Sequence, residues 1–119
     1  FRERTAQHDA LLIIDDRVDI ALAVDADGVH LGQSDLPISA ACAIAPDLLI
    51  GASTHNLEEA LTAQDAGASY VNIGGIKLHN IRQVLERGTR HVAVVTAVTA
   101  ADDVRAAATA LRKQILQAR

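Results

Sequence analysis

Short apolar runs that recur about every twenty residues constrain the fold of this chain more than any other feature of its sequence. The runs begin near residues 11, 29, 48, 70 and 92, and stretches with helical spacing of apolar residues separate them. A repeat of this length is close to one strand–helix unit. The alternation therefore predicts an α/β fold with parallel strands and leaves open whether they form an open sheet or a barrel.

The predicted elements follow from this alternation. We expect strands at residues 11–14, 28–32, 48–51, 70–73 and 92–95, and helices at 17–24, 37–45, 56–66, 78–86 and from 99 or 100 onward. Residues 1–10 are expected to be the end of a further helix. Asn56 is a predicted N-cap and Gly67 a predicted helix end, and Ser34 or Asp35 is expected to cap the helix that follows Pro37.

Composition excludes several classes of function. Aromatic residues make up 2% of the 119 residues and the net charge is −4, so neither a base-stacking surface nor wrapping by a polyanion is expected. No apolar run approaches the roughly 20 residues of a membrane-spanning helix. The single cysteine, Cys42, is expected to fill a small buried apolar position on a helix. We expect one domain over residues 1–119 and a cytoplasmic location.

Carboxylates follow two of the predicted strands. Asp15 and Asp16 end the strand at 11–14, and Asp35 follows the strand at 28–32. Parallel strands end at one edge of their sheet, where two carboxylates can share a divalent cation. The alternative is that these residues only cap the helices that follow. Without further information the two interpretations stay open.

Five stretches resemble the thiamine-phosphate synthase family, in the family's order and over nearly the whole chain. They are residues 11–21 (LLIIDDRVDIA), 28–36 (GVHLGQSDL), 50–56 (IGASTHN), 74–76 (GGI) and 92–98 (VAVVTAV). The resemblance implies a (β/α)₈ TIM barrel. It also implies a transferase that joins a hydroxymethylpyrimidine pyrophosphate to a thiazole phosphate in thiamine biosynthesis, releasing pyrophosphate.

The same resemblance implies roles for particular residues. Asp16 and Asp35 match the two aspartates that hold Mg²⁺. The predicted substrate contacts are Asp15 and Ser53 for the pyrimidine, and Gly74, Gly75, Val95 and Thr96 for the thiazole phosphate. The partners implied are these two small molecules, with no nucleic acid and no membrane, and a homo-oligomer is left open.

Three departures from the family pattern stand out. The first two strands, with a Gln-x-Arg-x-Lys motif, have no counterpart before Phe1. A Pro-Thr-x-Thr-Lys loop, a helix and a strand, roughly forty residues on the size of a barrel unit, are missing between Ile73 and Gly74. Asp15 stands where the family has asparagine. Five predicted strands make an incomplete barrel.

Two alternative functions remain after these departures. A thiazole tautomerase-like protein shares the barrel and a Ser-x-His stretch, but the pair Asp16 and Asp35 argues against it. A non-catalytic paralogue or fragment that binds a phosphate ligand is favoured by the missing lysine motifs. The role of His55 is left open, His30 is expected to be a hydrogen-bonded structural residue, and Gln33 is a candidate to line the pocket. His8, His79 and His91 are expected to face solvent.

Overall fold

The computed structural model describes residues 1–88 and 91–118, and within these ranges a single parallel sheet of five strands runs through the chain. The strands are β1 (Ile13–Asp15), β2 (Gly28–Leu31), β3 (Leu49–Thr54), β4 (Tyr70–Ile73) and β5 (Val92–Ala93). They lie side by side in chain order, β1-β2-β3-β4-β5. The predicted parallel α/β fold is therefore confirmed.

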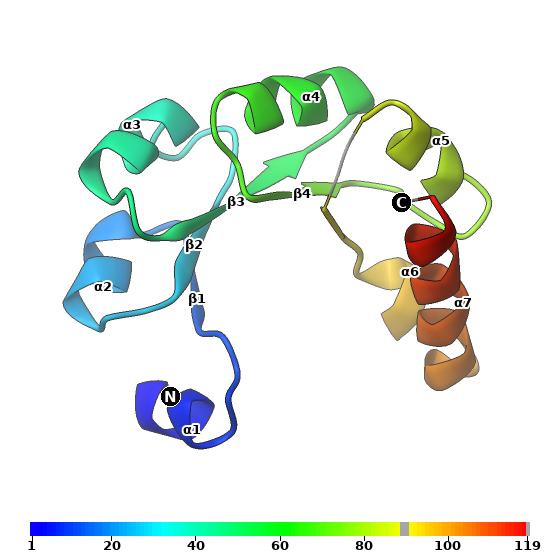
Figure 1. The fold of residues 1–119 in the computed structure, drawn as a ribbon, viewed down its shortest axis with the longest axis horizontal. Coiled ribbons are helices and arrows are strands. Elements are labelled where there is room, and N and C mark those ends of the chain that lie inside the picture. The colour runs from blue at the N-terminus through cyan, green and yellow to red at the C-terminus, as the bar shows by residue number, and fades with distance from the viewer. Residues whose placement is uncertain (89–90, 119) are drawn as a thin grey trace.

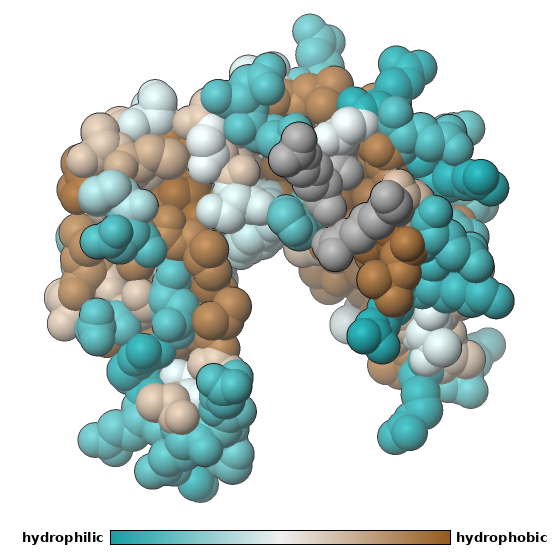
Figure 2. Space-filling model, in the orientation of Figure 1, coloured by the Kyte–Doolittle hydropathy of each residue, from teal (hydrophilic) through white to brown (hydrophobic). Residues whose placement is uncertain are grey.

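Helices alternate with the strands of this sheet, and one helix precedes β1. They are α1 (Arg2–Gln7), α2 (Val18–Ala23), α3 (Ile38–Ile44), α4 (Leu57–Asp65), α5 (Ile81–Glu86), α6 (Thr96–Thr99) and α7 (Val104–Gln117). Figure 1 shows α2, α3, α4 and α5 on the convex side of an arch, with α7 beside α5 and α6. The space between the two arms stays open when all side chains are drawn (Figure 2). The described strands thus form one side of a barrel.

Buried and less buried residues alternate along the central strands, and this alternation distinguishes the two faces of the sheet. Val29 and Leu31 of β2 and Ile50 and Ala52 of β3 are buried, whereas His30 between them is only half-buried. Successive side chains of a strand point to opposite faces, so the apolar set packs under the helices and the other set faces the inside of the arch. The buried residues form two clusters, one under α2 and α3 and one under α4, α5 and α7.

Most predicted boundaries agree with the structure within two or three residues, and the cap of α4 is confirmed. The Asn56 side chain accepts a hydrogen bond from Glu59 N at 2.9 Å, and α4 ends two residues before Gly67. The predicted cap of α3 is wrong. Pro37 is its N-cap residue without a side-chain hydrogen bond, and the Asp35 carboxylate instead accepts from Gly32 N at 2.7 Å. A short turn after β2 uses this carboxylate before the helix can begin.

The C-terminal third differs most from the prediction. Strand β5 has two residues, and residues 94 and 95, which are expected from the sequence to complete it, lie outside it and lead into the short helix α6. Helix α7 begins at Val104, several residues later than predicted, because Asp103 Oδ1 accepts from Ala106 N at 2.9 Å and caps it. Helix α5 begins at Ile81 because Asn80 Oδ1 accepts from Lys77 N in a preceding turn. A side-chain cap thus precedes α7, and a hydrogen-bonded turn precedes α5.

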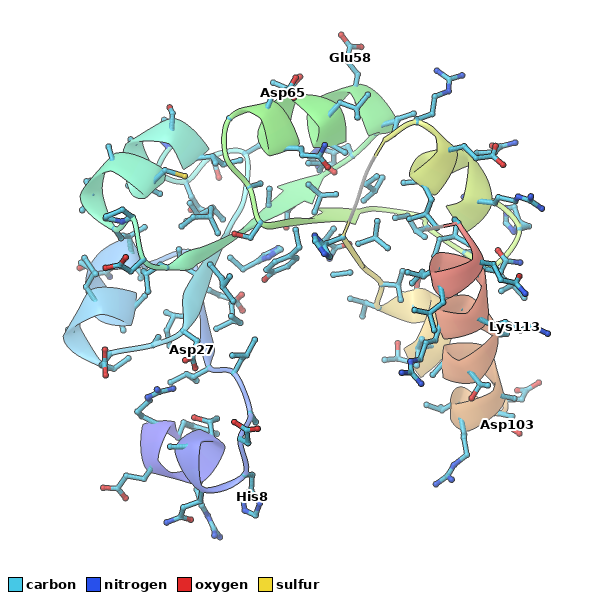
Figure 3. The ribbon with its side chains drawn as sticks, in the orientation of Figure 1. His8, Asp27, Glu58, Asp65, Asp103 and Lys113 are labelled. Atoms are coloured by element: carbon cyan, nitrogen blue, oxygen red, sulfur yellow. The ribbon has the colours of Figure 1, made fainter. Side chains whose placement is uncertain are left out.

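Asp27 joins helix α1 to the sheet, and its removal is expected to lower the melting temperature. Its Oδ2 atom accepts from Leu12 N at 2.7 Å and from Arg2 Nη1 at 2.6 Å. Asp27 lies between α1 and the strands in Figure 3. We expect Asp27→Ala to melt a few degrees lower at pH 7, because Leu12 N loses its acceptor and α1 its ion pair.

The pH dependence of this effect has a definite sign. The Leu12 N–H, and then the Arg2 guanidinium, hold the pKa of Asp27 below its ordinary value of 3.8, although loss of hydration opposes them. The stabilisation is therefore present above about pH 3.8 and is lost as the pH falls through the lower folded pKa. Thermal unfolding followed by circular dichroism tests this. Asp47→Ala, at an exposed loop position, is the control. Equal melting temperatures for both variants at pH 7 would contradict the prediction.

Candidate active site

The candidate site residues follow strand after strand along the carboxyl edge of the sheet. Because all the described strand pairs are parallel, the ends of β1 to β5 meet at this edge. It carries, in order, Asp15 at the end of β1 and Asp16 after it, Asp35 after β2, Ser53 in β3, Gly74 and Gly75 after β4, and Val95 and Thr96 after β5. Ligand sites of parallel α/β proteins lie at this edge.

Asp16 and Asp35 are brought together, as the sequence predicts. A hydrogen bond between their carboxyl groups and the repulsion between their charges raise the pKa of Asp16 above its ordinary value, and loss of hydration and the Asp15 charge add to the effect. Asp35 is fixed by the Gly32 N–H. Asp16 has a φ of 64°, a conformation uncommon outside glycine, and such strain is often found at functional sites.

The chemistry of this pair fits Mg²⁺. The Asp35 carboxyl raises the pKa of Asp16, so the pair forms a negative site that a cation would relieve. Mg²⁺ takes one or two carboxylates together with water and substrate oxygens. Within residues 1–88 and 91–118, no three His, Cys, Asp or Glu side chains form a metal-binding group. A cation here would thus depend on ligand oxygens beyond the two carboxylates.

Asp16→Asn is expected to raise the melting temperature at pH 7 in the presence of a chelator. The raised pKa favours the protonated form in the folded chain, so stability falls as the pH rises above 3.8 and through the folded pKa. Asparagine removes the repulsion and tolerates the left-handed backbone. We expect a gain of a few degrees in calorimetry.

Asp25→Asn provides the matched control for this experiment. Asp25 has a similar φ of 53° and is exposed, so its exchange reports the effect of asparagine in this conformation alone. If Asp16→Asn melted no higher than Asp25→Asn, charge repulsion at the pair would be refuted.

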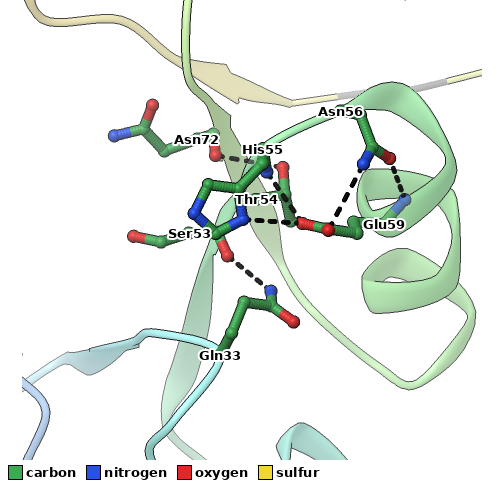
Figure 4. Close-up of polar contacts among 7 residues, drawn as sticks. All are labelled: Gln33, Ser53, Thr54, His55, Asn56, Glu59 and Asn72. Atoms are coloured by element: carbon green, nitrogen blue, oxygen red, sulfur yellow. Dashed lines mark hydrogen bonds and ion pairs between the residues drawn. The ribbon is translucent and has the colours of Figure 1, made fainter.

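Ser53 lies on the inner face of β3 in a hydrogen-bonded group. Its Oγ is 2.8 Å from His30 Nε2, and His30 Nδ1 is 3.0 Å from the Tyr70 hydroxyl. The Ser53 carbonyl accepts from the Gln33 side-chain amide at 2.7 Å (Figure 4). His30 is therefore a hydrogen-bonded residue, as predicted, and Gln33 ties the end of β2 to β3.

His55 occupies an exposed position beside this group. Its backbone N–H donates to Glu59 Oε2 at 2.8 Å, and its Nδ1 lies 3.1 Å from the same oxygen (Figure 4). The backbone N–H of His55, and then its ring, hold the pKa of Glu59 below its ordinary value. These contacts place His55 directly before Asn56, the N-cap residue of α4, where it is hydrogen-bonded to the first turn of that helix.

The two glycines after β4 leave the backbone accessible. A Cβ on Gly74 would meet only Thr54 O, at 3.9 Å, and nothing would lie within 4 Å of one on Gly75. The φ of 84° at Gly75 favours glycine. The exposed Lys77 lies two residues beyond Gly75. A ligand phosphate can therefore approach this turn closely, with a cationic residue next to it.

Val95 and Thr96 lie in a different local structure from the one expected. The sequence places them at the end of a strand, whereas Val95 is the N-cap residue of α6 and Thr96 begins that helix. Both are exposed just beyond β5. They stay at the carboxyl edge, and their predicted role as phosphate contacts stays a prediction.

Sequence reasoning missed Tyr70 as a member of the site. The strand register places Tyr70 in this group, because it pairs Asp15 with His30, His30 with Gly51 and Gly51 with Tyr70. A single sequence does not give register. The surface positions of His8, His79 and His91 are confirmed; Figure 3 shows His8 at the outer end of α1. Cys42 is on a helix as expected but only half-buried, with Sγ 3.7 Å from Gly67 O.

The fold and this edge define a partial (β/α)-barrel with an acidic pair at its carboxyl end, and comparison with known proteins gives the family. The family model described as thiamine monophosphate synthase matches residues 1–74. A thiamine-phosphate synthase of Pyrococcus furiosus is 44% identical over 94% of this chain and 70% of its own length. A thiamine-phosphate synthase of Shouchella clausii is 38% identical over 92% of this chain and 70% of its own length. The chain belongs to the thiamine-phosphate synthase family, which is a family of transferases.

Solved structures agree with this membership. Thiamine phosphate pyrophosphorylase from Pyrococcus furiosus superposes with a TM-score of 0.69 at 43% identity, covering 98% of this chain and 73% of that one. A 3-hexulose-6-phosphate synthase from Salmonella typhimurium has a TM-score of 0.67 at 14% identity, over 99% of this chain and 79% of that one, and supports the fold alone. The predicted TIM-barrel class, incomplete here, is confirmed.

The comparison also bears on the missing internal segment. The alignment with the Pyrococcus furiosus synthase has 146 positions, whereas 94% of this chain is about 112 residues, so about 34 positions of the relative lack a residue here. The family model stops at residue 74. Both findings agree with the expected gap of about one barrel unit after Ile73.

Among residues 1–88 and 91–118, no helix has the length and apolar character needed to cross a membrane. The cytoplasmic location and the homo-oligomer stay predictions from the sequence.

Proposed function

We propose that this chain catalyses the thiamine-phosphate synthase reaction with Mg²⁺. The bond between the pyrimidine methylene carbon and a pyrophosphate oxygen breaks, and the thiazole ring nitrogen forms the new bond to that carbon. The observation that carries the proposal is the meeting of Asp16 and Asp35 at adjacent strand ends, one strand from Ser53, in a member of this family. Neither carboxylate is needed as a nucleophile.

The acidic pair would hold the metal ion. Mg²⁺ bound by Asp16 and Asp35 would supply Lewis-acid neutralisation of the leaving pyrophosphate. Asp35 is oriented for this by the hydrogen bond from Gly32 N. Asp15 adds a third negative charge where the family has asparagine, so we expect it to strengthen cation binding and to weaken pyrophosphate binding without the cation.

The remaining residues would bind the two substrates. Ser53 would hydrogen-bond the pyrimidine ring from the inner face of β3. The turn at Gly74 and Gly75 would bring backbone N–H groups close to the thiazole phosphate, and Val95 and Thr96 would approach the same phosphate from the end of β5. The two substrates would then lie along one edge with their reacting atoms between β3 and β5.

Product formation tests the proposal directly. The 119-residue chain is incubated with both substrates in Mg²⁺ or in EDTA, and thiamine phosphate is measured chromatographically. We expect product only with Mg²⁺. If a chain shown to be folded by circular dichroism forms no product with Mg²⁺, catalysis by this chain is refuted.

A second candidate is a non-catalytic protein that binds a phosphate ligand. The roughly 34 unmatched positions of the relative, and a sheet whose described strands do not close, favour it. Calorimetric titration with pyrophosphate and Mg²⁺ distinguishes the two. Binding without turnover would support the second candidate, whereas turnover would exclude it.

A further inference from the structure

Four residues in register form a row across the inner face of the sheet. The strand pairing sets Asp15 beside His30, His30 beside Gly51 and Gly51 beside Tyr70. Gly51, which lies between His30 and Tyr70 in this row, has no side chain. A Cβ on Gly51 would overlap the Tyr70 ring and lie 2.5 Å from His30 Nδ1. Glycine at this position therefore lets His30 and Tyr70 meet across β3, with ring centroids 5.5 Å apart and an interplanar angle of 26°.

Both nitrogens of the His30 ring are used in this arrangement. Nδ1 is 3.0 Å from the Tyr70 hydroxyl oxygen, and Nε2 is 2.8 Å from Ser53 Oγ. A neutral imidazole has one N–H and one lone pair, so the two hydrogen bonds must run in one direction. Either Tyr70 donates to His30 and His30 donates to Ser53, or Ser53 donates to His30 and His30 donates to Tyr70.

The donor strengths of the two end hydroxyls select the first direction. Within residues 1–88 and 91–118, the structure gives His30 as the side-chain partner of both the Tyr70 hydroxyl and Ser53 Oγ, so either direction leaves one hydroxyl proton without a protein acceptor. A phenol hydroxyl, with an ordinary pKa of about 10, is a stronger hydrogen-bond donor and a weaker acceptor than the aliphatic hydroxyl of serine. Tyr70 is therefore the donor and Ser53 the acceptor.

We propose that Tyr70 and His30 are positioning residues that fix the direction of the Ser53 hydroxyl. Tyr70 donates to His30 Nδ1, His30 Nε2–H donates to Ser53 Oγ, and the Ser53 proton is left to donate to a ligand. Ser53 then selects an acceptor, such as an unprotonated ring nitrogen, over an amino or N–H group. The ligand part rests on the proposed function, whereas the direction of the hydrogen bonds is a property of the free chain.

NMR of the ligand-free chain tests this direction. In ¹⁵N-labelled protein at pH 8, where an ordinary histidine is neutral, two-bond ¹H–¹⁵N spectra separate protonated from unprotonated ring nitrogens. His30→Gln identifies the His30 signals by their loss. We expect His30 to be protonated at Nε2 and to accept at Nδ1. Protonation at Nδ1 in the wild-type chain would overturn the proposal.

Tyr70→Phe tests the role of the hydroxyl while keeping the ring. We expect the His30 Nδ1 signal to move toward that of a nitrogen without a hydrogen bond, while the signals of the exposed His8, His79 and His91 stay in place as internal controls. Unchanged His30 signals in this variant would also overturn the proposal. Because both spectra are recorded without substrate, their outcome is independent of whether the chain turns over.

The kinetic consequence is a second readout. A neutral hydrogen bond contributes roughly 1 kcal/mol, so Tyr70→Phe is expected to raise KM for the pyrimidine substrate about fivefold with a smaller change in kcat. A purely structural role would change the melting temperature and leave KM in place. An unchanged KM in a variant with altered His30 signals would refute the selection of the ligand by Ser53.

Discussion

Replacing Asp35 by alanine is expected to lower Mg²⁺-dependent product formation on the order of 10²-fold or more. The carboxylate is one of two that would hold the metal, and Lewis-acid stabilisation of a leaving phosphate is worth several kcal/mol, with each 1.36 kcal/mol a factor of ten in rate. Alanine also removes the acceptor of Gly32 N, whose hydrogen bond to Asp35 is 2.7 Å long. The measurement is product formed per unit time at saturating substrates and several Mg²⁺ concentrations.

Asp35→Asn separates the charge from the turn. The asparagine oxygen keeps an acceptor for Gly32 N, so this variant should fold at least as well as the wild-type chain, because repulsion with Asp16 is relieved. We still expect its activity to fall by a similar factor, since one negative metal ligand is gone. Activity near the wild-type level in Asp35→Asn would show that the carboxylate charge is not needed, which contradicts the metal-binding role.

Gly51→Ala is expected to destabilise the fold and to break the contact between His30 and Tyr70. The added Cβ would overlap the Tyr70 ring and approach His30 Nδ1, and Gly51 lies between the buried residues Ile50 and Ala52. Adding a methyl group to a packed position typically costs 1–3 kcal/mol, so we expect a loss of about this size in the free energy of unfolding. Urea denaturation followed by circular dichroism measures it.

Gly74→Ala is the matched control for this loss. Its Cβ would meet only Thr54 O, at 3.9 Å, so we expect the free energy of unfolding to change by less than about 0.5 kcal/mol. A similar loss in both variants would show that the exchange of glycine for alanine in itself, and not the space for His30 and Tyr70, explains the result. The His30 NMR signals should change in Gly51→Ala alone.

The sequence by itself determined the strand–helix alternation, the parallel sheet and the family. Apolar runs such as 11–14 and 92–95 are long enough for strands and too short for helices, so the period could be recognised without tertiary information. The carboxylates were found for the same reason, since Asp16 and Asp35 directly follow strands. The cap at Asn56 was predictable because its hydrogen bond spans only three residues.

Tertiary structure decided the features that depend on strand register, and the sequence left open which of several competing local hydrogen bonds would form. The start of α7 depended on which of several polar residues, finally Asp103, could cap it. The Asp35 carboxylate accepts from Gly32 N in the turn that precedes α3, and so it does not cap that helix. The row that joins His30, Gly51 and Tyr70 spans forty residues of sequence and exists only once three strands pair in one register. A one-residue shift of any of these strands would turn its residue of the row to the other face of the sheet. Strand pairing, which is a long-range property, therefore fixed the hydrogen bonding of Ser53.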